Sequence, residues 1–161
     1  MVGKLLVEEA RRYLGVEEVP RGSNRGPEID YWLLEAFVAV PKGQRLGAPW
    51  CMAFVWCMGR QALGHRWPVP RTASVQAVHD WAKRAGCLEP TGGEGDLLLL
   101  WHQNLGRYAH VAIVTGGVTA YTTVEGNTNP GGSRDGWGVY ARERKATAST
   151  AFVRWSSMLR D

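Results

Sequence analysis

The chain changes its hydrophobic pattern near Gly86. Before this glycine, apolar residues recur at the three- and four-residue spacing of helices. After it, they fall in short β-prone runs divided by Gly, Asn and Pro, which is typical of a sheet with frequent reversals. Helices followed by antiparallel strands define the α+β class. We therefore expect N-terminal helices packed on a C-terminal antiparallel β-sheet.

Four helices are expected in the first part of the chain, over residues 3–14, 27–40, 51–63 and 73–84. Gly15 follows the first helix and is the residue type that most often ends one. Pro27 opens the second in the first turn, where proline is tolerated. The third is apolar nearly all round, so we expect it to be buried. Thr72 or Ser74 could cap the fourth.

Five strands are expected in the second part, in the segments 95–102, 110–117, 120–127, 136–144 and 151–155. The 20 glycines of the chain are consistent with the many turns that such a sheet requires. No internal repeat, low-complexity tract or linker divides the sequence, and 161 residues can bury a core without metal or disulfide staples. We expect a single domain over residues 1–161.

The net charge limits the kinds of partner that fit the chain. A charge of +4 and a pI near 9.2 favour a mildly anionic partner, such as a cell-wall polymer, a nucleic acid or a membrane surface. The positive charges are scattered and form no nucleic-acid-binding cluster. No apolar run approaches the ~20 residues that span a bilayer. We therefore expect neither nucleic-acid binding nor membrane insertion.

One of the three cysteines is placed to react. An odd number excludes a complete internal set of disulfides, so reduced thiols are expected. Cys51 follows a proline-bearing loop and begins the third helix, where free amide groups and the helix dipole favour an anion. The thiolate is the reactive form of cysteine, and such a position lowers a thiol pKa. Cys57 and Cys87 lack this position, and we interpret both as core packing.

A nucleophilic cysteine needs a base, and the base needs an orienting group. His110 opens an apolar strand, which would hold its ring rigidly against a helix-borne thiol. Glu125 and Asn127 end the next strand and are two residues apart, hence on one face of an extended chain. Either could accept the second ring N–H of His110. The remaining histidines lie in less constrained contexts: His65, His79 and His102.

Four segments, in this order, resemble the CHAP domain family of cysteine- and histidine-dependent amidohydrolases and peptidases: PWCMAFV, GDLLLLW, HVAIVTG and VEGNTN. The segment YLGVEEVPRGSNRGPEID is similar to the helical lead-in of compact members, so the resemblance covers about residue 10 to residue 144. It implies a papain-like fold and cleavage of an amide bond in bacterial peptidoglycan. By motif, Cys51 takes the nucleophile position, His110 the base, Glu125 the orienting group and Asn127 a fourth polar position.

The chain departs from the family pattern at two places. Met52 stands where a small residue is usual. Some relatives bind calcium through an Asp-rich loop, but RGSNRGPEID has only Glu28 and Asp30, and NPGGSRDG has only Asp135. These residues fall short of a calcium ligand set, and the cysteine spacing does not suit zinc. We therefore expect no metal and no other cofactor.

Substrate recognition must then come from the catalytic domain itself. Tryptophans near the motifs are the candidates for the substrate-binding surface: Trp50, Trp101 and Trp137. The expected function is a monomeric peptidoglycan hydrolase, as in phage lysins. The N-terminus does not read as a signal peptide, so we expect synthesis in the cytoplasm and action on the wall after release, export or virion delivery. The alternative is a non-catalytic wall-binding or virion structural protein that retains the fold.

Overall fold

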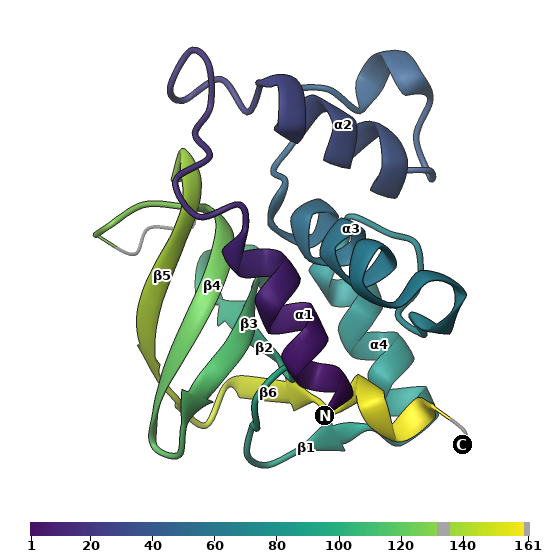
Figure 1. Cartoon of the computed structure of the whole chain (residues 1–161), viewed down its shortest axis with the longest axis vertical. Coiled ribbons are helices and arrows are strands. Elements are labelled where there is room, and N and C mark those ends of the chain that lie inside the picture. The colour runs from purple at the N-terminus through teal and green to yellow at the C-terminus, as the bar shows by residue number, and fades with distance from the viewer. Residues whose placement is uncertain (132–135, 160–161) are drawn as a thin grey trace.

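The computed structural model describes residues 1–131 and 136–159 (Figure 1). The helices are α1 (Val2–Arg11), α2 (Pro27–Ala36), α3 (Cys51–Leu63) and α4 (Val75–Ala85). The strands are β1 (Leu88–Glu89), β2 (Leu97–His102), β3 (Arg107–Gly117), β4 (Ala120–Thr128), β5 (Gly138–Lys145) and β6 (Thr150–Val153). Short 3-10 turns lie at Lys42–Gln44, Gly64–Arg66, Gln103–Leu105 and Trp155–Met158. The predicted α+β class is confirmed.

The strands form one antiparallel sheet in the order β1-β6-β2-β3-β4-β5. Helices α1, α3 and α4 contact the sheet, and α2 packs on α3. Figure 1 shows α1 crossing in front of the sheet, with α3 beside it and α2 above α3. The start of α3 therefore lies between a helical layer and strands β3 and β4, which are the strands that α3 contacts.

The core explains why α3 is apolar all round. Every residue from Cys51 to Gly59 is buried, because α1, α2 and the sheet surround this helix. On β3, Val111 and Ile113 belong to the same large core as α3, whereas Ala112 and Val114 belong to a second, smaller cluster. Alternate residues of a strand face opposite sides, so β3 is covered on both faces. This double burial gives a rigid support for any side chain that β3 carries.

The structure differs from the sequence-based expectations mainly at element ends. Helix α1 ends at Arg11 instead of residue 14, and α2 ends at Ala36 because Phe37 leaves helical geometry (φ −87°, ψ 55°). Ser74 is the cap of α4, and its hydroxyl accepts the N–H of Ala77 at 3.1 Å. Strand β1 was not predicted, because two residues carry no alternation. None of the described helices has the length and apolar content needed to cross a membrane.

Candidate active site

Cys51 is the first residue of α3. The helix has no side-chain cap at this end, and its first internal bond runs from the Phe54 N–H to the Trp50 carbonyl at 2.9 Å. The N–H groups of the first turn therefore have no partner within the helix, and they point toward the start of the helix. These N–H groups and the helix dipole place a partial positive charge at the position of Cys51. The prediction that Cys51 begins this helix is confirmed.

His110 lies inside β3, not at its start as the sequence suggested. The strand begins at Arg107, and its pairing with β2 shifts between Leu100 and Trp101, so that Ala109 has no direct partner. The thiol of Cys51 donates to the carbonyl oxygen of Ala109 at 3.8 Å. The irregular pairing thus places the backbone just before His110 against the thiol of Cys51. Bulges of this kind often redirect a side chain beside an active site.

The imidazole of His110 is held by Glu125. Nε2 of His110 lies 2.7 Å from Oε1 of Glu125, and both side chains are almost fully buried. An ionised carboxylate can only accept hydrogen bonds, so Nε2 carries the hydrogen. The other ring atom, Nδ1, is buried and makes no hydrogen bond of ordinary geometry within the described residues. Nδ1 is therefore the ring atom available to accept the proton of Cys51.

The pKa of each member of this pair is shifted toward its charged form. Burial alone would lower the pKa of His110, but hydrogen bonds and charge interactions with Cys51 and Glu125 raise it to about 9. Burial alone would raise the pKa of Glu125, but Arg144 and His110 lower it to about 2. His110 is thus a cation near neutral pH and Glu125 is an anion.

Two further residues hold the carboxylate, and neither was identified from the sequence. Arg144 on β5 donates from Nη2 to Oε1 of Glu125 at 2.6 Å and from Nε to Oε2 at 2.9 Å. The hydroxyl of Thr123 donates to Oε2 at 2.6 Å. The signal was present in the strand pattern, because Thr123 precedes Glu125 by two residues and so shares its face. The contact of Arg144 with Glu125 could not be predicted without the pairing register of β4 and β5.

Asn127 does not share the role of Glu125. Its φ is 54°, so the chain is not extended there, and the expectation that the two residues lie on one face of a regular strand is wrong. The side chain of Asn127 is 3% exposed, and its Oδ1 has no hydrogen-bond partner among the described residues. Asparagine tolerates this left-handed conformation better than most residues, and the pairing of β4 with β5 shifts between Glu125 and Thr128. Glu125 is the group that accepts from His110.

Trp50 lies in the core and not on a substrate-facing surface, which corrects its prediction as a substrate-binding residue. Its ring is 0% exposed, packs against Trp32 at 5.6 Å between centroids, and donates from Nε1 to Glu18 at 2.9 Å. The second oxygen of Glu18 accepts the N–H of Gly22 at 2.8 Å. This buried carboxylate thereby ties the loop after α1 to the residue that precedes Cys51. No pattern in the sequence predicts that Glu18 is buried.

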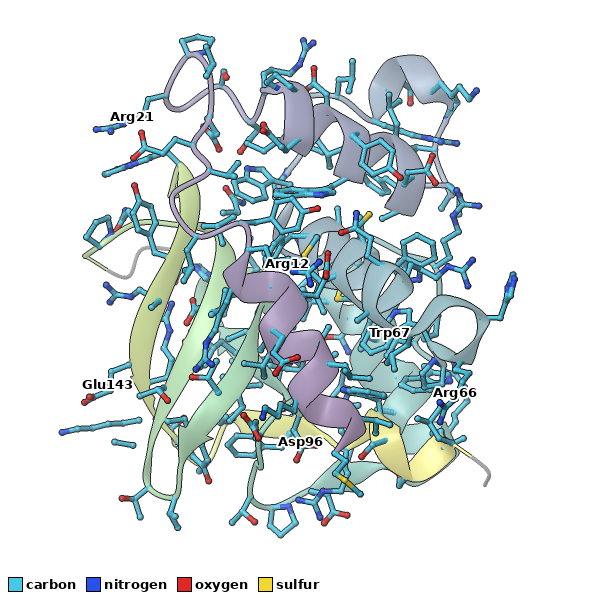
Figure 2. All side chains as sticks on the ribbon, viewed as in Figure 1. Arg12, Arg21, Arg66, Trp67, Asp96 and Glu143 are labelled. Atoms are coloured by element: carbon cyan, nitrogen blue, oxygen red, sulfur yellow. The ribbon has the colours of Figure 1, made fainter. Side chains whose placement is uncertain are left out.

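Trp101 and Trp137 are more accessible. Trp101 is 39% exposed and meets Tyr108 edge-on at 5.2 Å, and Tyr108 stacks on His79 at 4.3 Å. This row of rings lies close along the chain to Ala109, the acceptor of the Cys51 thiol. Trp137 is half-buried, and the guanidinium of Arg21 lies 4.6 Å from its ring. Figure 2 shows Arg21 on the long loop between α1 and α2.

The other two cysteines are packing residues in the structure. Cys57 is 3% exposed and Cys87 is 1% exposed. Burial, followed by the charge of Glu35, raises the pKa of Cys57 to about 12. Burial also raises the pKa of Cys87. Burial therefore disfavours the thiolate form of both residues.

Within residues 1–131 and 136–159, no group of three or more His, Cys, Asp or Glu side chains is arranged to hold a metal ion. Glu28 and Asp30 both lie in α2, where Asp30 pairs with Arg25 at 2.8 Å. Asp135, the remaining acidic residue considered for calcium, lies outside the described residues.

No family model, no curated protein and no solved structure matches this chain. A thiol at a helix N-terminus, an imidazole with one ring nitrogen available, and a carboxylate bound to the other nitrogen form the arrangement of a cysteine nucleophile. Such a set can transfer an acyl group from an amide to water.

Proposed function

We propose that the protein is a cysteine-dependent amidase or endopeptidase that cleaves an amide bond of bacterial peptidoglycan. The observation that carries the proposal is the buried bond between His110 and Glu125, together with the contact of Cys51 to the carbonyl of Ala109, next to His110. A structural histidine has no need of a carboxylate on one nitrogen and an available acceptor on the other. The choice of peptidoglycan rests on the resemblance to CHAP domains, which also implies a papain-like fold.

In the proposed reaction, the proton of Cys51 lies on Nδ1 of His110, and the thiolate sulfur of Cys51 attacks the amide carbonyl. The tetrahedral oxyanion is stabilised by N–H groups at the start of α3. His110 then gives its proton to the leaving amine, and a thioester remains on Cys51. Water, deprotonated by His110, attacks the thioester and releases the carboxylic acid and the thiol. Glu125 keeps the imidazole in the required tautomer throughout.

Two surface properties support a wall polymer as substrate. The net charge of +4 favours an anionic partner. The exposed ring of Trp101 continues through Tyr108 toward Ala109, and aromatic rings of this kind provide flat apolar contacts with a polar edge. We propose that Trp101 contacts substrate on this side of the nucleophile.

The first prediction is that Cys51→Ala abolishes hydrolysis, with a loss of roughly a thousandfold or more, because the nucleophile acts as a unit with His110. The assay follows the turbidity of a wall suspension and the release of new amino groups. Cys57→Ala and Cys87→Ser are the matched controls and should retain activity, since both thiols are buried. Mass spectrometry of the products identifies the amide that is cut.

Full activity of the folded Cys51→Ala variant would overturn the enzymatic proposal. A wild-type protein that sediments with walls but releases no new amino group would instead support the non-catalytic wall-binding alternative.

A further inference from the structure

The carboxylate of Glu125 accepts hydrogen bonds from two cationic side chains, those of His110 and Arg144. Its Oε1 accepts from Nε2 of His110 at 2.7 Å and from Nη2 of Arg144 at 2.6 Å. Its Oε2 accepts from Nε of Arg144 at 2.9 Å and from the hydroxyl of Thr123 at 2.6 Å. The side chain of Glu125 is 0% exposed and that of Arg144 is 17% exposed. A simple Cys–His–Glu set does not require the arginine.

We propose that Arg144 is a positioning residue of the active site: it fixes the plane of the Glu125 carboxylate against His110, and its charge limits how strongly that carboxylate favours the protonated imidazole. The part of this proposal that concerns turnover rests on the proposed function. The part that concerns the charge of His110 can be tested on the thiol alone.

The register of the sheet explains how Arg144 reaches the site. Arg144 is opposite Tyr121, and Tyr140 is opposite Glu125. Tyr121, Thr123 and Glu125 are alternate residues and share one face of β4. The side chain of Arg144 therefore runs along this face, and its planar fork meets both carboxylate oxygens. A bidentate arginine fixes the orientation of a carboxylate, which a lysine cannot do.

The electrostatic effect of Arg144 opposes that of Glu125. Two groups that titrate face His110, namely Cys51 from α3 and Glu125 from β4. The charged groups that face Glu125 are His110 and Arg144. Because the arginine and the imidazole bond the same oxygen, they lie side by side, and like charges disfavour each other. Removing the guanidinium should make His110 harder to deprotonate, whereas removing the carboxylate should make it easier.

The test is the rate of alkylation of Cys51 by iodoacetamide as a function of pH, with the modified peptide identified by mass spectrometry. This rate depends on the fraction of Cys51 that is a thiolate and on the protonation state of His110, and its measurement needs no substrate. As the pH increases, the alkylation rate rises once when the ion pair of Cys51 and His110 forms, and again when the imidazolium of His110 loses its proton. The variants are Arg144→Gln, Arg144→Lys and Glu125→Gln. Lys145→Gln is the charge-matched control, because Lys145 is the exposed neighbour of Arg144 on β5.

We expect Arg144→Gln to move the upper step of this profile to higher pH by about 1 unit, and Glu125→Gln to move it to lower pH by a similar amount. Arg144→Lys keeps the charge and should leave the step in place, while wall hydrolysis falls roughly tenfold or more because the fork is lost. Lys145→Gln should change neither measurement.

If Arg144 had only a structural role, Arg144→Gln would reduce the melting temperature without moving the upper step of the alkylation profile. An unmoved step in Arg144→Gln therefore overturns the electrostatic part, and wild-type turnover in Arg144→Lys overturns the positioning part. If Arg144→Gln does not fold, Arg144→Lys still decides the positioning part and a shifted step in that variant contradicts the electrostatic part. Failure of the proposed function is seen separately, as a wild-type protein that is inert on walls but keeps a two-step alkylation profile.

Discussion

Glu125 is a buried acceptor, and this property decides how protons are distributed over His110. The carboxylate binds Nε2, so the neutral imidazole must expose its lone pair at Nδ1, which is where Cys51 requires it. An amide in the same place could present either its oxygen or its nitrogen to the ring. It would also add no negative charge to favour the imidazolium. The carboxylate therefore fixes both the tautomer and the charge.

We predict that Glu125→Gln shifts the upper limb of the pH–rate profile for wall hydrolysis to lower pH. Loss of the anion lowers the pKa of His110, which is about 9 in the wild type, so the thiolate–imidazolium pair is lost sooner as the pH rises. Turnover at neutral pH should also fall. The measurement is the rate across pH 5 to about 10, with the melting temperature recorded as a check of folding.

Asn127→Ala is the comparison for this prediction. Asn127 does not bond His110, so its removal should reduce the rate with little movement of the limb, as expected of a group that positions substrate or stabilises the oxyanion. The two roles must be exchanged if Asn127→Ala moves the limb and Glu125→Gln leaves it in place.

At the scale of elements, the site depends on how closely β4 approaches α3. Gly126 lies between the two polar residues at the end of β4. A Cβ at Gly126 would lie 2.8 Å from Cζ3 of Trp50 and 2.9 Å from Cβ of Phe54. The strand therefore touches the start of the helix directly, at the residue that precedes Cys51. Only a residue without a side chain permits this contact.

We predict that Gly126→Ala destabilises the protein by about 1–3 kcal/mol, because the added methyl group overpacks a filled interior. It should also reduce activity, since β4 must move away from the start of α3 and carries Glu125 with it. Gly43→Ala is the matched control: a Cβ there meets nothing within 4 Å, and the change should be neutral or slightly stabilising. Denaturant unfolding of the two variants and of the wild type makes the comparison. Equal stability of Gly126→Ala and Gly43→Ala would contradict the packing argument.

The elements also show which parts of the site the sequence could and could not predict. Helix α3 has the bounds that its apolar pattern and the preceding proline-bearing loop predict, so Cys51 was placed correctly at its start. The pairing shift beside Ala109 was not predictable, because it depends on which residues of β2 and β3 meet. Arg144 was missed for the same reason, because its contact with Glu125 joins two neighbouring strands, β5 and β4. The periodicity of a sequence predicts which residues share one face of a strand, but only the pairing register shows which residues of the adjacent strand they contact.

At the scale of the whole molecule, the buried charges link the site to the stability of the fold. Glu125 is fully buried and is stable as an anion because Arg144, His110 and Thr123 surround it. In the unfolded chain this carboxyl titrates near 4.5, and in the folded protein its pKa is about 2. A group whose pKa is depressed by folding stabilises the fold above its unfolded pKa. That contribution is lost as the pH falls from about 4.5 to about 2.

We predict that Glu125→Gln flattens the acid side of the stability–pH curve. Between these two pKa values, the unfolded state of the wild type binds one more proton at Glu125 than the folded state does. The free energy of unfolding therefore decreases as the pH is lowered, by on the order of 3 kcal/mol in all. His110 is protonated in both states throughout this range and does not contribute. Glu143→Gln is the matched control, because Glu143 is exposed on β5 and points away from the sheet (Figure 2). Denaturant titrations between about pH 5 and pH 3 should give a shallower slope for Glu125→Gln than for the wild type and Glu143→Gln. Parallel slopes for all three proteins would mean that Glu125 is not held as an anion by its buried partners.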